Sequence, residues 1–140
     1  DHSIISALQL AVLRGVDVRV MIPDNPDGPV VAMANWSYTK DLLPAGVRVF
    51  RYGPGFMHQK VTLIDGDLCA IGTANFDNRS FKLAFEITAI VNDKEFSQEV
   101  QNMLKADFAS ATEVSEQHLS RRPIWFKPAM ALARLFSPVL

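Results

Sequence analysis

The chain has 140 residues, of which 49% are hydrophobic and 21% charged, and this composition suits one globular domain with a working core. Its formal net charge of −1 gives no general electrostatic attraction for nucleic acid. The charge is uneven, because the last 20 residues hold four bases and no acid, so the remainder sums to −5. The single cysteine, Cys69, lies in an apolar run, which predicts a buried thiol rather than a disulfide or a metal site.

Helical and extended patterns alternate through the first half of the chain. Apolar residues recur at helical spacing after Ser3, which is suited to cap a helix, and the pattern ends at Gly15. Alternating valine and isoleucine then predict a strand over residues 16–22. A second helix is expected over residues 30–43 and a short strand over residues 47–52.

The second half opens with two apolar runs joined by Asp65-Gly66-Asp67, which is a signal for a β-hairpin. The expected elements are strands over residues 58–65, 68–74 and 85–91, a helix over residues 94–109 and a polar linker over residues 110–122. With the elements of the first half, they predict an α/β fold in which helices flank a mixed β-sheet.

The last 20 residues mix bases with aromatic and aliphatic side chains. Pro128 suits the start of a helix and Pro138 its end, which leaves about three turns. The expected apolar stripe consists of Trp125, Ala129, Leu132, Ala133 and Phe136. This helix is too short and too charged to span a bilayer. It suits an anionic lipid surface, with Trp125 at the headgroup level, or docking on a part of the protein outside this chain.

Side chains suited to phosphate chemistry lie on the predicted hairpin. His58 and Lys60 are two residues apart and therefore share one face of a regular strand. An imidazole beside an ammonium group suits the handling of a phosphate anion. Asp65 lies an odd number of positions from both and points to the opposite face, where its carboxylate can brace the strand.

Two further predicted strands bring polar groups to the same face. Thr73 and Asn75 share a face of the return strand and offer a hydroxyl and an amide to a phosphate. Glu86 is a lone acid in an apolar run, and a carboxylate bonded to an imidazole nitrogen favours the charged ring. Taken singly, Glu86 would be a salt-bridge partner for Arg79 or Lys82, but the joint pattern indicates one pocket.

The motif resembles that of a known superfamily. Residues 57–65 read Met-His-Gln-Lys-Val-Thr-Leu-Ile-Asp, and with residues 72–80 and Phe85-Glu86 they are similar to the HxKxxxxD motif and trailing GxxN of the phospholipase D superfamily. Further stretches that resemble its bacterial cardiolipin synthase branch are residues 14–19, 52–58, 122–126 and 132–138. The likeness covers the whole chain and corresponds to the carboxy-terminal half of such an enzyme.

The resemblance implies a role for each residue of the motif. His58 would be one of two catalytic histidines, of which one forms a phosphohistidine while the other protonates the departing alcohol, and the acid–base role is the expected one here. Lys60 and Asn75, aided by Thr73, would hold the phosphate, and Glu86 would orient the imidazole. Asp65, the last residue of the motif, would be a structural support.

The reaction implied is a phosphatidyl transfer. A phosphatidyl group would move from one phosphatidylglycerol to a hydroxyl of another, which yields cardiolipin and glycerol. Because one phosphodiester replaces another, no cofactor is expected, and His2 and His118 lack the neighbours that a metal site needs. The alternatives are a phosphodiesterase of the phospholipase D type, a nuclease of the same superfamily, or an inert fragment that binds only a membrane or a partner.

The chain carries one HxKxxxxD copy, whereas the resemblance implies a site built from two. We expect residues 1–111 to form a catalytic half-domain with one HxKxxxxD copy, and residues 112–140 to form a linker and an amphipathic segment. The chain opens without Met, and we expect it to be a piece of a longer protein whose amino-terminal half carries the second copy, or to pair with a second chain. The other expected partners are phosphatidylglycerol, cardiolipin and the anionic surface of the bacterial cytoplasmic (inner) membrane, with no nucleic acid among them.

Overall fold

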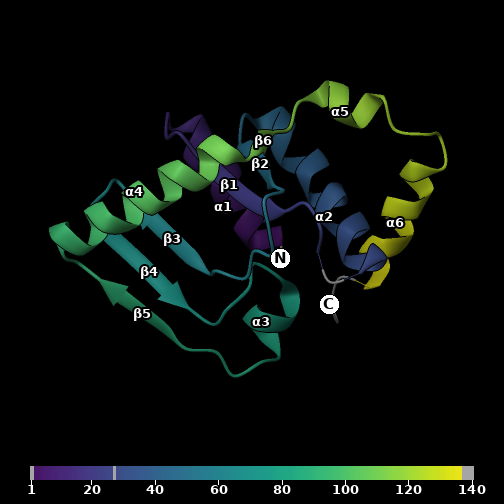
Figure 1. The fold of residues 1–140 in the computed structure, drawn as a ribbon. Coiled ribbons are helices and arrows are strands. Elements are labelled where there is room, and N and C mark those ends of the chain that lie inside the picture. Colours follow the sequence, from purple (N-terminus) through teal and green to yellow (C-terminus); the bar gives the residue numbers. More distant parts are fainter. Residues whose placement is uncertain (1, 27, 137–140) are drawn as a thin grey trace.

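The computed structural model describes residues 2–26 and 28–136 and contains two small sheets flanked by helices (Figure 1). The helices are α1 (His2–Leu13), α2 (Pro29–Leu42), the 3-10 helix η1 (Leu43–Ala45), α3 (Asn78–Lys82), α4 (Lys94–Ser110), α5 (Glu116–Ser120) and α6 (Phe126–Phe136). The strands are β1 (Arg19–Pro23), β2 (Arg48–Tyr52), β3 (Val61–Ile64), β4 (Leu68–Gly72), β5 (Thr88–Val91) and β6 (Thr112–Glu113). The predicted α/β class is confirmed.

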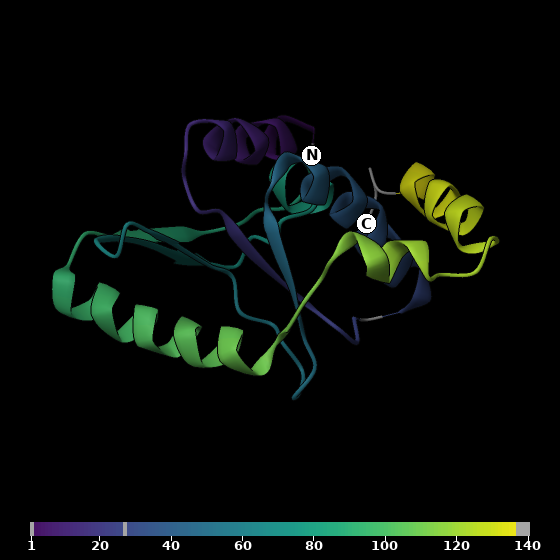
Figure 2. The same cartoon turned by 90° about the horizontal axis from the view of Figure 1, so that it is seen from above.

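The first sheet is mixed, in the order β1-β2-β6. β1 and β2 pair in parallel, as is usual when a helix connects two strands, and β6 adds to β2 in the antiparallel sense. Side chains alternate along β2, so Val49 belongs to the core cluster while Phe50 packs edge-to-face on Phe108 of α4 at 4.8 Å. Helices therefore cover both faces of this sheet, with α1 and α2 opposite α4 (Figure 2).

The second sheet is antiparallel, in the order β3-β4-β5, and its register aligns Leu63, Cys69 and Val91. α4 covers this face, and the Cys69 side chain is fully buried there. Burial raises the pKa of the Cys69 thiol, because the thiolate would lose its hydration. The predicted buried thiol is confirmed. The opposite face exposes Ile64 and Ile90, at 50% and 71%.

α2 is the centre of the hydrophobic core. Its Trp36 is 5% exposed and packs edge-to-face on Phe126 of α6, with ring centroids 6.0 Å apart. The buried cluster consists of Trp36, Leu42, Val47, Val49, Val114, Phe126 and Met130. Burying each large apolar side chain stabilises the fold by about 1.5–3 kcal/mol. Because the cluster runs from Trp36 to Met130, residues far apart in the sequence share this stabilisation.

The predicted polar linker over residues 110–122 is wrong as a description of this segment. It contains β6 and α5, and Val114, which follows β6, is 6% exposed and lies in the core. The physical reason is that the two residues of β6 pair with the edge strand β2, whose backbone groups need hydrogen-bond partners. The segment is therefore packed into the same body as the residues before it.

The tail forms a helix as predicted, but with a different buried face. Phe126, Met130 and Ala133 are buried against α2, whereas Trp125 and Leu132 of the predicted stripe are 62% and 59% exposed. The contact between Phe126 and Trp36 of α2 decides which face of α6 is buried. The helix begins at Phe126, two residues before Pro128. Arg134 adds an ion pair to Asp41 of α2 at 2.6 Å. The side chain of Phe136 and the predicted helix end at Pro138 lie outside the described residues.

Candidate active site

A tight turn sets the register of the hairpin that carries the HxKxxxxD motif. Asp65 and Gly66 both have positive φ angles, of 52° and 75°, and the Asp67 amide donates to the Ile64 carbonyl at 3.1 Å. This geometry matches the right-handed twist of an antiparallel pair, and aspartate and glycine adopt it readily. The predicted hairpin is confirmed. Asp65 is exposed in this turn, at the end of β3 away from His58, so it lies outside the regular strand on which its facing was predicted.

Backbone bonds join the other ends of the three strands. The Gly72 amide donates to the Lys60 carbonyl at 3.1 Å, and the Thr73 amide donates to the Ile87 carbonyl at 2.9 Å. The side chains follow this frame, because Thr73 Oγ1 donates to Glu86 Oε2 at 2.5 Å and accepts from the Ile87 amide at 3.0 Å. The structure thus bonds Thr73 to Glu86 and places Lys60 near enough to act on the Glu86 charge, although all three lie just outside β3, β4 and β5 and not within the predicted strands.

Hydrogen bonding keeps Glu86 ionised. The Thr73 hydroxyl bond is the main cause of a lowered pKa of Glu86, followed by a hydrogen bond from Ser80, while the positive charges of Lys60 and Arg79 lower the pKa further. Desolvation opposes these effects. At neutral pH Glu86 is therefore a carboxylate, and the Lys60 ammonium group is near enough to favour that charge.

His58 lies outside the regular strand. The predicted strand over residues 58–65 begins only at Val61, because residues 53–60 form an irregular segment that leads in from β2. The imidazole is exposed and stacks on Phe56, with ring centroids 5.6 Å apart and planes at 13°. It lines a shallow hollow of about 280 Å³ with Tyr52 and Asp107. Lys60 reaches back to this segment, since its Nζ donates to the His58 carbonyl at 2.7 Å.

The predicted contact between Glu86 and His58 is not formed. Within residues 2–26 and 28–136 the two side chains share no hydrogen bond, and Glu86 bonds Thr73 instead. The reason is local, since the Thr73 hydroxyl on the neighbouring strand is fixed by the Ile87 backbone, while His58 lies in an irregular segment before β3. Stacking on Phe56 is the feature of His58 that the strand pattern gave no means to predict.

Hydrogen bonds to Ser80 and Asp77 hold the loop that carries Asn75. The Asn75 amide donates to Ser80 Oγ at 3.0 Å, and the Ser80 amide donates to Asp77 Oδ1, the N-cap of α3, at 2.7 Å. Ser80 is buried, whereas Asn75 is exposed, so the side-chain carboxamide of Asn75 is available to a ligand. Ser80 thus holds this turn through two hydrogen bonds, and its hydroxyl also bonds Glu86.

No group of three histidine, cysteine or acidic side chains suited to hold a metal ion occurs in the part of the chain that the structure describes. The side chains at this hairpin offer an imidazole, an ammonium group and two uncharged donors, which suit an anion.

We expect Thr73→Val to raise the pKa of Glu86 towards its ordinary value of 4.5, because the substitution removes the strongest bond to the carboxylate. A carboxyl group with a lowered pKa stabilises the fold at pH values above its unfolded pKa, and this contribution is lost as the pH falls through the folded pKa. Thr73→Val should therefore make the protein less sensitive to acid. The measurement is an NMR titration of the Glu86 carboxyl carbon, with Thr88→Val as the control, and an unchanged Glu86 titration in Thr73→Val would contradict the assignment.

The fold and the hairpin site place the chain in a structural class. A crystal structure of a phospholipase D family member, Nuc from Salmonella typhimurium, matches with a TM-score of 0.65 and 20% sequence identity over 79% of this chain and 72% of that chain. NucT from Helicobacter pylori matches with a TM-score of 0.63 and 17% identity over 81% of this chain and 75% of its own. At such identities the likeness shows the fold, which is that of the phospholipase D family.

Sequence comparisons identify the family more narrowly. The family model described as "Cardiolipin synthase, PLD-like domain" matches residues 1–108. Proteins called cardiolipin synthase A match all of this chain: that of Pseudomonas syringae pv. syringae (strain B728a) is 52% identical over 142 residues, and those of Pseudomonas fluorescens (strain Pf-5) and Pseudomonas putida (strain GB-1) are each 49% identical over 140 residues. The chain belongs to the cardiolipin synthase PLD-like domain family. It spans 29% of the length of these curated relatives.

Proposed function

We propose that this chain carries one of two half-sites of a phosphatidyltransferase that makes cardiolipin from two molecules of phosphatidylglycerol and releases glycerol. The observation that carries the proposal is the cluster of Lys60, Thr73 and Glu86 beside the His58 segment, in a chain of the cardiolipin synthase family. Residues 1–111 supply the catalytic groups in this proposal, and residues 112–140 complete the core and present a surface helix.

In the proposed mechanism two histidines divide the work. One histidine attacks the phosphorus of phosphatidylglycerol, so that a P–N bond forms and the P–O bond to glycerol breaks, and the other gives its proton to the departing glycerol oxygen. The second histidine then takes the proton from a hydroxyl of the acceptor phosphatidylglycerol, whose oxygen displaces the histidine from phosphorus. His58 suits the acid–base role, and Lys60 with Asn75 would hold the phosphoryl oxygens. The Thr73 hydroxyl, which already donates to Glu86, aids them by fixing the frame.

The proposed site needs a second half, and apolar side chains around it suit a large apolar partner. Glu86 stands between two of the most exposed residues, Phe85 at 107% and Ile87 at 74%. Other exposed apolar residues of the same three-strand region are Phe56, Ile64, Phe76, Leu83 and Ile90. A soluble surface rarely carries so many without a partner. We propose that the remaining length of the protein, which carries a second HxKxxxxD copy, or a second chain, covers this surface and brings the other histidine.

We also propose that the outer face of α6 rests on the anionic surface of the bacterial cytoplasmic membrane. None of the helices described within residues 2–26 and 28–136 has the length and apolarity needed to span a bilayer. The inner face of α6 is packed on α2, while Trp125 just before the helix, Lys127 and Leu135 are all exposed. Apolar side chains with flanking bases suit an anionic lipid interface.

We expect bromine-labelled phosphatidylglycerol vesicles to quench the fluorescence of Trp125, because bromine quenches only at short range and the indole would sit at headgroup depth. The quenched component should disappear in Trp125→Phe and persist in Trp36→Phe, since Trp36 is 5% exposed. Equal quenching in the protein and in Trp125→Phe would remove the surface role of α6.

An assay of the natural gene product with phosphatidylglycerol vesicles tests the proposed function. The expected products are cardiolipin and glycerol in equal amounts, with no nucleotide or metal added. Release of phosphatidic acid with glycerol would instead identify a hydrolase of the phospholipase D type, and cleavage of an oligonucleotide would identify a nuclease. Either result would overturn the proposed transfer reaction.

A further inference from the structure

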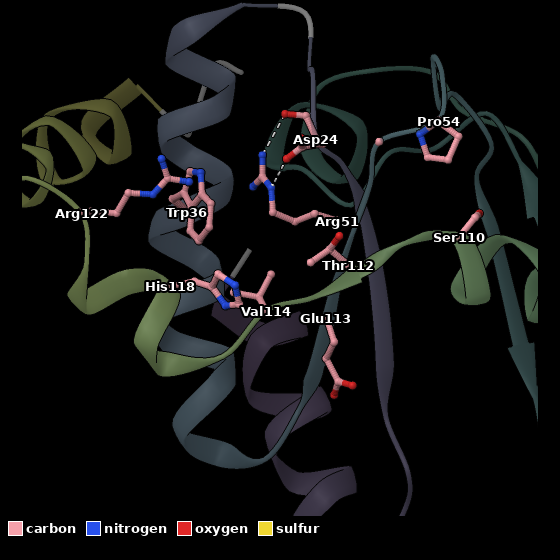
Figure 3. Close-up of a pocket in the computed structure, with 11 residues that line it drawn as sticks. Asp24, Trp36, Arg51, Pro54, Ser110, Thr112, Glu113, Val114, His118 and Arg122 are labelled. Atoms are coloured by element: carbon pink, nitrogen blue, oxygen red, sulfur yellow. Dashed lines mark hydrogen bonds and ion pairs between the residues drawn. The ribbon is translucent and has the colours of Figure 1, made fainter.

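A second hollow lies on the other side of β2 from the catalytic groups. It has a volume of about 410 Å³ and is lined by residues of α2, β2, β6 and α5 (Figure 3). It shares no lining residue with the hollow at His58. Three of its lining side chains are cationic or can become so, namely Arg51, Arg122 and His118.

Arg51 is a buried cation with one unused donor. Its side chain is 10% exposed, its Nε donates to Asp24 Oδ1 at 2.6 Å, and its Nη2 donates to the Asp24 carbonyl at 2.9 Å. The remaining Nη1 is buried with no hydrogen-bond partner. A charged donor left unpaired in the interior is costly, so the position calls for an acceptor.

The guanidinium groups of Arg51 and Arg122 both lie against the indole ring of Trp36. The Cζ atoms of Arg51 and Arg122 lie 4.4 and 4.5 Å from the ring centroid of Trp36, and Figure 3 shows the indole flanked by both groups. Arg122 is exposed, and its guanidinium group lies over the rings of Trp36 and Phe126 and forms no ion pair with a carboxylate in the described part of the chain. Its guanidinium donors therefore remain available to an anion.

The other polar groups of the hollow favour an anion as well. His118 accepts the Ser115 amide at Nδ1 over 3.0 Å, which leaves Nε2–H as the donor of the neutral ring. The two acids of the lining are already engaged, since Asp24 bonds Arg51 and Glu113 bonds Arg48 at 2.8 and 2.9 Å. Arg122 and His118 therefore have no carboxylate partner among the lining residues.

We propose that this hollow binds a phosphate group, held by Arg122 and by the unused Nη1 of Arg51, at a site separate from the catalytic one. Guanidinium groups bind phosphate oxygens through paired, charge-assisted hydrogen bonds, and a bound oxygen would satisfy the orphaned donor. The phosphate comes either from an anionic phospholipid or from solution. Ile124 and Trp125 follow Arg122 in the chain and are 93% and 62% exposed, which offers an apolar surface to the chains of a lipid. The inference does not depend on the proposed transfer reaction.

The test uses the natural gene product labelled with 5-fluorotryptophan, in a His58→Ala background so that lipid is not consumed. The ¹⁹F resonance of Trp36, assigned with Trp36→Phe, reports on the ring between the two guanidinium groups. Inorganic phosphate is titrated at constant ionic strength in one arm, and short-chain phosphatidylglycerol in non-ionic micelles in the other. We expect a saturable shift of the Trp36 resonance in at least one arm, and the arm identifies the source of the phosphate.

Two matched variants decide whether the shift reports this site. Arg122→Gln should weaken binding by about tenfold or more, as loss of a charge-assisted bond requires, whereas Arg121→Gln, which removes the same charge from the neighbouring residue, should change it by less than about twofold. Equal weakening in both variants would mean a bulk charge effect and would overturn the site. Absence of a saturable shift in both arms would overturn it as well.

Discussion

His58→Ala is expected to lower the rate of cardiolipin formation by roughly 10³-fold or more, because either catalytic role of the imidazole in the proposed mechanism is lost. Folding should be unaffected, since His58 is exposed, its ring stacks on the exposed Phe56, and it precedes the first residue of β3. The measurements are the initial rate with phosphatidylglycerol vesicles and the midpoint of chemical denaturation, which should move by less than about 0.5 kcal/mol in free energy.

Gln59 offers a matched control for this experiment. It is the next residue, it is exposed, and its side-chain amide donates to Asp107 at 2.9 Å. Gln59→Ala should keep most of the activity although it disturbs the same segment. Near-normal turnover in His58→Ala would refute the assignment of His58, whereas loss of turnover in both variants would show that the segment, and not the imidazole, matters.

Gly72→Ala is expected to impair both stability and activity, because there is no space for a side chain at this position. A Cβ atom on Gly72 would lie 2.3 Å from the Ile87 carbonyl oxygen and 2.8 Å from the Thr88 Cα, both of them backbone atoms of the neighbouring strand. β5 would have to move, and with it Glu86 and the bond from Thr73. Overpacking of this kind costs about 1–3 kcal/mol, which chemical denaturation measures directly.

The control is Gly55→Ala, where a Cβ atom would meet nothing within 4 Å. This variant should leave the free energy of unfolding within about 0.5 kcal/mol of the parent protein. If Gly72→Ala denatures at the same midpoint as Gly55→Ala, then β4 and β5 do not approach each other as closely as the structure has them.

The parts of the fold that local chemistry specifies could be predicted from the sequence. The Asp65-Gly66 turn combines residues that tolerate positive φ with flanking apolar runs, and the turn fixes the pairing of β3 with β4. The same hairpin carries Lys60 just before β3 and Thr73 just after β4, and Glu86 precedes the next strand, β5. This part of the fold could be predicted because residues close together in the sequence determine the turn and the strand pairing.

Other features depend on partners distant in the sequence, and patterns do not reveal those partners. A two-residue strand such as β6 has no periodicity to detect, and its existence depends on the free edge of β2. The face of α6 that is buried was decided by Trp36, almost a hundred residues earlier. Likewise, the Thr73–Glu86 bond follows from the backbone at Ile87, and a rule that pairs acids with histidines could not anticipate it.

The buried thiol of Cys69 can report local opening of the β3-β4-β5 sheet. Cys69 lies in the central strand of the second sheet, and it is the only cysteine of the 140 residues. An alkylating reagent can reach it only when β4 separates from α4, so its rate of modification reports that opening even while the rest of the fold stays intact. Docking of a partner on the far side of the same sheet would slow the modification.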